Sequence, residues 1–413
     1  MKARSVLTLL LAAQAGAVTV TPGPDAPRPI RPDTVSGFNL GNWMPVVEAL
    51  PQLRALDTAL LRWPGGNVGD ENDLTPAGLQ TLKTNWTLLG EPALIVQTRV
   101  FTRAGVGKAS PADAAQAVRD ARDKGLRVAY WEIGNEPNLY ATNRSDPSWT
   151  PEKYCATVRA QRAAILAVDP AARIAGPAVS NPGEYLNEVI RRCGDALDLV
   201  TWHLYPTDGS AAPAAALASA EQATTSAEQV RALWADPATN PLGHLKPLNM
   251  AVTEYGLSWR TNKGRHLSDA VGGLWAAEAT LRFSAAGAST AYFALMGTGN
   301  HGLLDEAGFP RFAYGTFHEL AHYRGQTFSV QSDDPRVWVH AAQQGAVVTL
   351  FALNTADSTL PLTATLPGLS LIGAKAVTDE DVNADRPPRA LNIRGPVALP
   401  PLSLTRLVFK AQP

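Results

Sequence analysis

Residues 131–138 read Trp-Glu-Ile-Gly-Asn-Glu-Pro-Asn, and they close a short apolar stretch, Arg127–Ile133, that predicts a β-strand. Pro137 fixes its own backbone and is expected to hold Glu136 in an extended conformation. The stretch therefore presents Glu136 rigidly at the end of a strand, with Asn135 beside it. Residues at the carboxyl ends of strands carry the chemistry in parallel barrel folds, so Glu136 is a candidate catalytic residue.

Strand-like runs alternate with helix-like runs through the first three quarters of the chain. Several of the strand-like runs are continuously apolar, as expected for parallel strands covered by helices. Eight such units predict a (β/α)8 TIM barrel over residues 36–325. The alternative is an open doubly wound sheet, which the absence of a Gly-rich phosphate loop after the first strand disfavours. The predicted strands are Gly37–Trp43, Leu60–Trp63, Ala93–Arg99, Arg127–Ile133, Arg173–Gly176, Leu199–Tyr205, Asn249–Glu254 and Thr290–Leu295.

Capping residues followed by proline, and apolar stripes at helical spacing, mark helices between these strands. One of them, the Ala-rich segment Ala214–Trp234, is predicted to form a single long helix. After Tyr323 the pattern changes to short alternating strands separated by turn residues, which predicts a C-terminal antiparallel β-sandwich over residues 326–413. A strand at Ala17–Thr21, within the N-terminal segment 18–35, could join that sandwich.

The composition limits the classes of function. The chain has 413 residues, 45% of them hydrophobic, and a net charge of −1. This near-neutral charge argues against nucleic-acid binding and against a strong electrostatic membrane anchor, and no apolar run is long enough to span a membrane. No cluster of ligand residues predicts a metal, and no cofactor is required.

The N-terminus resembles an export signal. Lys2 and Arg4 precede the apolar run Val6–Ala13, and small residues up to Ala17 offer a cleavage site. We therefore expect residues 1–17 to be a signal peptide and the protein to be secreted or periplasmic. A buried N-terminal strand is the alternative.

Two cysteines, Cys155 and Cys193, would suggest a disulfide in an exported protein. Cys155 lies near the start of one predicted helix and Cys193 at the end of the next. In parallel helices these positions differ in height by about 15 Å, which is too far for a bridge. The sequence therefore favours two small buried thiols.

Two glutamates, Glu136 and Glu254, are predicted at strand ends on opposite sides of one barrel mouth. Glycoside cleavage needs such a pair, with one carboxyl group protonated and the other ionised. Arg62 is expected to keep Glu254 ionised. Asp70 and Glu71 are expected to form a solvated loop. The residues predicted to bind a carbohydrate substrate are Asn135, Arg62, Asn67, His203, Tyr205, Trp43, Trp259 and His301.

Five segments carry a resemblance to a known family: Leu61–Asn67, Trp131–Asn138, Val200–Tyr205, Val252–Gly256 and Gly302–Asp305. The sequence resembles the retaining glycoside hydrolases of clan A, in the branches that hold heparanase and β-glucuronidases, α-L-arabinofuranosidases and β-xylosidases. The resemblance implies a barrel with a β-sandwich made partly from the N-terminus.

The resemblance also implies roles for individual residues. Glu136 matches the acid/base, Glu254 the nucleophile and Asn135 a contact to the sugar 2-hydroxyl, while Arg62 and Tyr205 match residues of the same motifs.

Two positions depart from the family pattern. Trp259 stands where the glucuronidase branch has a Tyr that helps to hold the sugar carboxylate, so uronic-acid specificity is not implied. Phe293–Met296 lacks the Trp that many clan members have at the end of the eighth strand. The alternatives to a hydrolase are an inactive carbohydrate-binding protein on the same fold and a transglycosylase.

Overall fold

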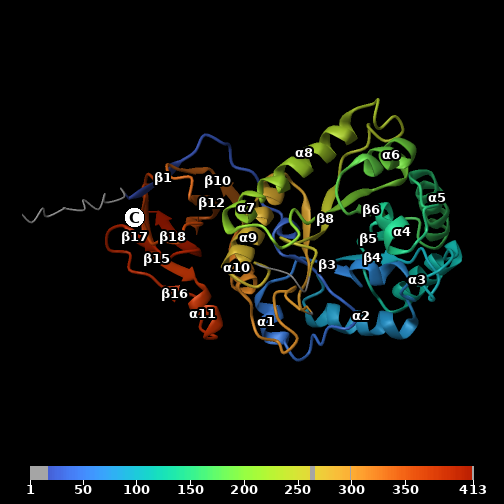
Figure 1. Ribbon diagram of the computed structural model, residues 1–413, viewed down its shortest axis with the longest axis horizontal. Helices are drawn as coiled ribbons and strands as arrows, with labels where there is room; N and C mark the ends of the chain where they lie inside the picture. The colour runs from blue at the N-terminus through green and yellow to red at the C-terminus, as the bar shows by residue number, and fades with distance from the viewer. Residues whose placement is uncertain (1–16, 261–265, 298, 412–413) are drawn as a thin grey trace, which may run out of the picture.

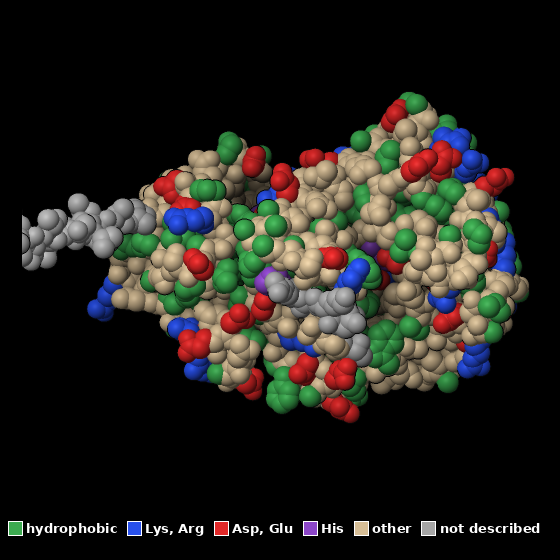
Figure 2. Space-filling view, in the orientation of Figure 1, with side chains coloured by type: hydrophobic (Ala, Val, Ile, Leu, Met, Phe, Trp, Pro, Cys, Tyr) green, Lys and Arg blue, Asp and Glu red, His purple; other side chains and the backbone are tan. Residues whose placement is uncertain are grey.

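The computed structural model describes residues 17–260, 266–297 and 299–411. The predicted signal peptide, apart from Ala17, lies outside these residues. Two bodies are visible in Figure 1, a barrel surrounded by helices and a smaller β-domain beside it. In the space-filling view, acidic and basic side chains are interspersed on the visible face, and no large region of one sign stands out (Figure 2).

Eight parallel strands close into a barrel, which confirms the predicted fold class. A small separate apolar cluster lies among the strands and consists of Leu60, Ile95, Ala175, Leu199 and Ala251. The larger core lies mainly between the strands and the helices around them. The strands are β2 (Gly37–Asn39), β3 (Leu60–Trp63), β4 (Ala93–Thr98), β5 (Tyr130–Ile133), β6 (Ile174–Val179), β7 (Leu199–Leu204), β8 (Met250–Tyr255) and β9 (Ser289–Tyr292).

The helices of the barrel follow the strands in the expected alternation. Their caps explain several boundaries: the Ser110 and Asp113 side chains form a capping box, and the Thr150 side chain accepts from the Lys153 backbone N–H. The helices are α1 (Leu50–Ala55), α2 (Pro76–Leu88), α3 (Pro111–Asp123), α4 (Tyr140–Asn143), α5 (Pro151–Val168), α6 (Glu184–Cys193), α7 (Pro213–Ala218), α8 (Glu221–Ala235), α9 (Ala270–Ala285) and α10 (Phe312–Leu320), with short 3-10 turns η1 (Pro32–Thr34), η2 (Gly66–Asp70), η3 (Pro137–Leu139) and η4 (Gly194–Ala196).

The prediction of one helix over Ala214–Trp234 is wrong, because α7 ends at Ala218 and α8 begins at Glu221. Ser219 lies at the break. Its hydroxyl donates to the carbonyl of Ala216 and accepts from the indole N–H of Trp275 in α9. A packing contact with α9 thus overrides the high helix propensity of the alanines.

Cys155 and Cys193 form a disulfide with their Cα atoms 5.7 Å apart, so the expectation of two separate thiols is wrong. That expectation placed the starts of α5 and α6 at the same height. In fact Cys155 Sγ lies 3.7 Å from the carbonyl of Val189 in α6, and Arg159 of α5 donates to the carbonyl of Arg192 near the end of α6. The ten-residue α6 therefore ends beside the early turns of α5, where Cys155 lies.

The C-terminal body is a β-sandwich of two sheets around its own apolar core. One sheet has the order β11-β1-β14-β17, and the other has the order β10-β12-β13-β18-β15-β16. The pairs are antiparallel except for β1 with β14, so the N-terminal strand is part of this domain. The elements are β1 (Val18–Pro22), β10 (Gln326–Phe328), β11 (Val330–Ser332), β12 (Val337–Gln344), β13 (Val347–Asn354), β14 (Leu360–Ala364), β15 (Leu369–Val377), α11 (Asp379–Asn383), β16 (Arg389–Ala390), β17 (Val397–Leu399) and β18 (Ser403–Ala411).

Two buried glutamates join the barrel helices to the sandwich. Glu278 in α9 lies 2.8 Å from Nε2 of His340 in β12, and Glu319 in α10 pairs with Arg406 in β18. Both glutamates are only 2% exposed, so the interface buries charge that is paired across it. Among the described residues, we find no helix with the length and apolar character needed to cross a bilayer.

Candidate active site

The turn after β3 brings polar groups to the mouth of the barrel. Gly65 and Gly66 both have positive φ angles, 76° and 65°, which favour glycine. A Cβ atom on Gly65 would lie 2.9 Å from Oδ1 of Asn39, closer than ordinary packing allows. The two glycines thus let the chain turn tightly over the barrel and set Asn67 at its mouth.

Arg62 is fully buried and connects three strands. Its Nε donates to Glu132 over 2.6 Å, Nη1 to Oε2 of Glu254 over 3.1 Å, and Nη2 to Oδ1 of Asn135 over 2.7 Å. Burial opposes the charge of the guanidinium, but the two glutamates outweigh it and raise the pKa of Arg62. A permanent cation therefore stands between the strand ends.

Glu254 is 8% exposed at the end of β8 and accepts hydrogen bonds on both carboxylate oxygens. Arg62 donates to Oε2, and the hydroxyl of Tyr205 donates to Oε1 over 2.6 Å. Both donors fix the direction of the carboxylate. This arrangement suits a group that must attack as an anion.

Glu136 does not adopt the predicted extended conformation. Its φ and ψ are 50° and 51°, in the left-handed region, which is strained for a residue with a side chain. Its backbone N–H donates to the carbonyl of Ala178, and its own carbonyl accepts from Leu139. Proline excludes the right-handed helical region for Glu136, and these two bonds select the left-handed alternative over the extended one.

The carboxyl group of Glu136 is held ready for protonation. Burial raises its pKa to about 7, with Arg62 acting in the opposite direction. Nδ1 of His203 lies 3.0 Å from Oε1 of Glu136. Burial also lowers the pKa of His203 to about 4, so this imidazole is neutral at neutral pH.

The two glutamates face one another across His203. Its Nδ1 lies 3.0 Å from Oε1 of Glu136 and 3.9 Å from Oε2 of Glu254. These two distances place the carboxylate oxygens at most about 6.9 Å apart. The strand ends therefore bring together the pair that the sequence predicted, although the residues are far apart in the chain.

A cavity of about 850 Å³ opens over this pair. Its lining includes amide, hydroxyl and aromatic side chains. Its lining residues are Gly66, Asn67, Asn135, Glu136, Leu139, Asn143, Ser180, Asn181, Tyr205, Glu254, Trp259, Phe293 and His301.

Seven predicted residues line this cavity: Asn67, Asn135, Glu136, Tyr205, Glu254, Trp259 and His301. Arg62 and His203 lie behind it, fully buried, and act on the carboxylates rather than on the cavity. Trp43 is not a lining residue of this cavity. The first strand ends at Asn39, earlier than predicted, and the Trp43 ring lies against Gly41 with 47% of the residue exposed.

Sequence reasoning missed two buried acids. Glu132, which precedes the motif glutamate by four residues, is fully buried on β5 and pairs with Arg62. Asp70, expected in a solvated loop, is also fully buried and accepts from the backbone N–H of Asn135. An acid inside an apolar strand was a usable signal for Glu132, whereas nothing in the polar sequence around Asp70 indicated burial. The lining residues Leu139, Asn143, Ser180 and Asn181 were missed as well.

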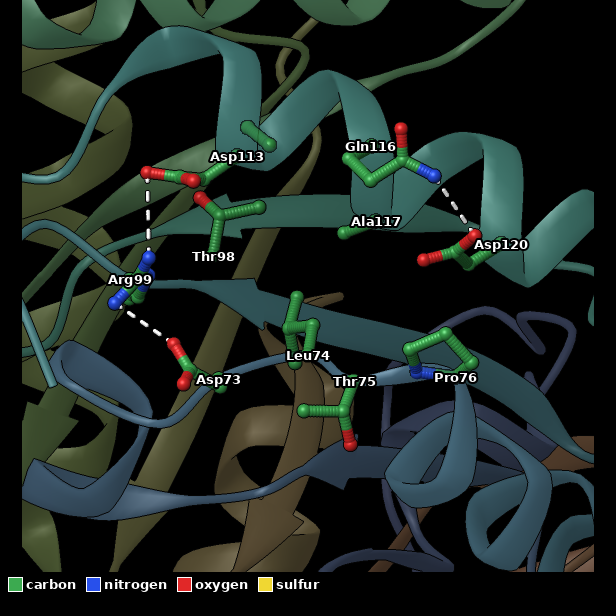
Figure 3. Close-up of a pocket in the computed structure, with 11 residues that line it drawn as sticks. Asp73, Leu74, Thr75, Pro76, Thr98, Arg99, Asp113, Gln116, Ala117 and Asp120 are labelled. Carbon is green, nitrogen blue, oxygen red and sulfur yellow. Dashed lines mark hydrogen bonds and ion pairs between the residues drawn. The ribbon is translucent and has the colours of Figure 1, made fainter.

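A smaller hollow of about 220 Å³ lies elsewhere, between the loop after η2, the end of β4 and α3. In Figure 3 the guanidinium of Arg99 lies between Asp73 and Asp113, at 2.8 and 3.3 Å. Arg99 pairs with both of these acids, and the hollow shares no lining residue with the cavity over the glutamates. We assign it a structural role, since Arg99 ties the loop to the start of α3. Among the described residues there is no group of three or more His, Cys, Asp or Glu side chains that could hold a metal ion.

No protein-family model matches the chain, and no curated protein matches it in sequence. Solved structures do match it in fold. A family 51 α-L-arabinofuranosidase from Bifidobacterium longum matches with a TM-score of 0.72 and 16% identity, over 96% of this chain and 100% of that chain. An α-L-arabinofuranosidase from Thermotoga maritima gives 0.73 and 13%, over 95% and 100%. A monomeric β-xylosidase from Caulobacter crescentus gives 0.68 and 16%, over 97% and 100%.

These structures define the class of fold. The chain has the barrel and sandwich architecture of clan A glycoside hydrolases, which confirms that part of the resemblance. At these identities the likeness concerns the fold alone, and the chemistry of this chain is argued from its own residues.

Proposed function

We propose that the chain is a retaining glycoside hydrolase that cleaves O-glycosidic bonds of oligo- or polysaccharides by double displacement. The observation that carries the proposal is the contrast between the two glutamates. Two donors orient the carboxylate of Glu254, whereas burial raises the pKa of Glu136 to about 7. One carboxylate is thus prepared to attack and the other to donate a proton.

In the first step an oxygen of Glu254 attacks the anomeric carbon. The bond to the leaving oxygen breaks, and that oxygen takes the proton of Glu136. In the second step water attacks the same carbon, Glu136 takes a proton from the water, and the bond to Glu254 breaks. The bound of about 6.9 Å on these two oxygens is compatible with the roughly 5 Å between the carboxyl groups of retaining enzymes.

The remaining residues supply orientation and sugar contacts. Asn135 directs its Oδ1 to Arg62 and its Nδ2 to Asn67, and we assign it the contact to the sugar 2-hydroxyl. Trp259 lines the cavity and is 57% exposed, and Arg260 lies over one face of its ring at 4.6 Å, so we assign the stacking on a sugar ring to the other face. His301 lines the same cavity and is assigned a substrate contact. An inactive binding protein would not need two intact carboxylates with opposite protonation.

We further propose that the protein is exported. The N-terminal pattern at residues 1–17 supports this proposal, and so does the disulfide between Cys155 and Cys193, since such bonds persist in oxidising compartments. The test is N-terminal sequencing of the protein recovered from medium and periplasm.

A panel of chromogenic glycosides tests the activity with wild type, Glu254→Ala and Glu136→Ala. The similar structures are described as arabinofuranosidases and a xylosidase, so the panel begins with α-L-arabinofuranosides and β-xylosides and extends to oligosaccharides. We expect wild type to cleave at least one substrate and Glu254→Ala to lose that activity. A wild type that binds sugars but cleaves none would favour the binding protein, and transfer of the sugar to added acceptors in preference to water would favour the transglycosylase.

A further inference from the structure

Asp70 is a carboxylate that the proposed reaction does not use, and it lies at the end of η2 with no exposure to solvent. Its Oδ1 accepts from the backbone N–H of Asn135 over 2.7 Å and from the hydroxyl of Tyr140 over 2.5 Å. Asn135 directly precedes Glu136. Asp70 therefore holds the backbone one residue before the proposed acid, without lining the cavity itself.

Other contacts fix Asp70 in turn. Its backbone carbonyl accepts from Val100 and Phe101, both at 2.9 Å, just beyond the end of β4. Arg144 lies 3.4 Å from Oδ2 and donates to the carbonyl of Asn67 over 2.9 Å. The loop after β3, the segment after β4 and the turn after β5 thus meet at this one residue.

The turn that Asp70 holds is unusually dependent on such support. Gly134 and Glu136, on either side of Asn135, both have positive φ angles, 74° and 50°. The left-handed conformation of Glu136 is strained, and strain of this kind persists only when the surroundings enforce it. Burial raises the pKa of Asp70 to about 7, while Tyr140 and Arg144 act in the opposite direction. Keeping a carboxyl group here is costly, which is expected where it serves function rather than stability.

We propose that Asp70 is a positioning residue that fixes the Asn135–Glu136 turn, so that Glu136 delivers its proton to the leaving oxygen. This inference rests on the proposed glycosidase function. It predicts a defect in proton delivery, which a general loss of structure would not reproduce.

The test compares leaving groups. The dinitrophenolate leaving group of a dinitrophenyl glycoside departs without an acid, whereas an alkyl or sugar leaving group needs one. The constant kcat/KM reports the step in which the leaving group departs. In Asp70→Ala we expect kcat/KM to fall about 30-fold or more on the unactivated substrate and less than about threefold on the dinitrophenyl substrate. Asp70→Asn keeps an acceptor for the Asn135 N–H and should recover most of the loss.

Glu71→Gln is the matched control, since Glu71 pairs with the same Arg144 at 3.0 Å but makes no contact with Asn135. This variant should lower kcat/KM on the two substrates equally or not at all. If Asp70→Ala does not fold, Tyr140→Phe decides, because it removes a hydroxyl that contacts both Asp70 and the Asn135 N–H. In Tyr140→Phe we expect kcat/KM to fall about threefold more on the unactivated substrate than on the dinitrophenyl substrate.

Equal losses on both substrates, in whichever of these two variants is folded, would overturn the positioning role. That result leaves the proposed function intact, because wild type would still cleave both substrates. A wild type that cleaves neither would instead refute the proposed function and, with it, this inference.

Discussion

Arg62 donates a hydrogen bond from Nη1 to Oε2 of Glu254 over 3.1 Å, from a position with no exposure to solvent. The same guanidinium holds Glu132 and Asn135 with its other nitrogens. Preorganised charge of this kind is usually the largest single contribution to catalysis, because it needs no rearrangement during the reaction.

Replacing Arg62 by Lys should therefore disable the site. A point charge cannot reach three partners in fixed directions, so we expect kcat to fall by about a hundredfold or more. The single ammonium of Lys cannot keep both the Glu132 and the Glu254 pair, and removal of one member of a buried pair typically costs about 3–5 kcal/mol of stability. Steady-state kinetics and denaturant unfolding measure the two effects. A variant with near wild-type kcat would show that Arg62 has no part in the reaction.

The pH dependence should report Glu136. As the acid it must carry a proton, and burial raises its pKa to about 7. Activity should therefore persist below that pH and fall as the pH rises through it, which gives kcat/KM an alkaline limb near pH 7. On a dinitrophenyl glycoside, whose leaving group needs no acid, this limb should be absent from both wild type and Glu136→Gln. An unchanged alkaline limb in the variant would assign the titration to another group.

Trp259 and Trp43 offer a matched pair. Both are exposed, but Trp259 lines the cavity and Trp43 does not. Aromatic stacking contributes about 0.5–1.5 kcal/mol, so Trp259→Ala should raise KM roughly two- to tenfold with little change in kcat. Trp43→Ala should leave both constants unchanged. Equal effects of the two substitutions would mean that the cavity does not locate the substrate.

The interface between barrel and sandwich predicts a pH effect on stability. His340 and Arg282 outweigh the effect of burial and lower the pKa of Glu278. A lowered pKa adds stability above the ordinary value of 4.5, and this stability is lost as the pH falls through the lower, folded-state pKa. At neutral pH the Tm of wild type should therefore be higher than that of Glu278→Gln. This difference in Tm should narrow below about pH 4.5.

Glu188→Gln is the control for this measurement, since Glu188 pairs with arginines of its own exposed helix face. Such pairs contribute little, so its Tm should match that of wild type. A constant gap between wild type and Glu278→Gln across the pH range would contradict the linkage.

The sequence was sufficient for the barrel and for the glutamate pair, because both follow from local patterns. Apolar runs marked all eight strands, and the rule that parallel strands end at one mouth placed Glu136 and Glu254 together. The predictions that failed concern features that depend on contacts between distant segments. The height of α6 against α5 decided the disulfide, and the carbonyl of Ala178 helped to decide the conformation of Glu136. The burial of Asp70 required the turn after β5 to close over it.

The proposed mechanism requires Glu254 as the nucleophile. The direct measurement is mass spectrometry of proteolytic peptides after incubation with a fluorosugar that forms the glycosyl-enzyme quickly and releases it slowly. We predict one sugar adduct, on the peptide that carries Glu254, and none in Glu254→Ala. An active enzyme that forms no adduct, or that carries the sugar on another residue, would contradict the proposed mechanism.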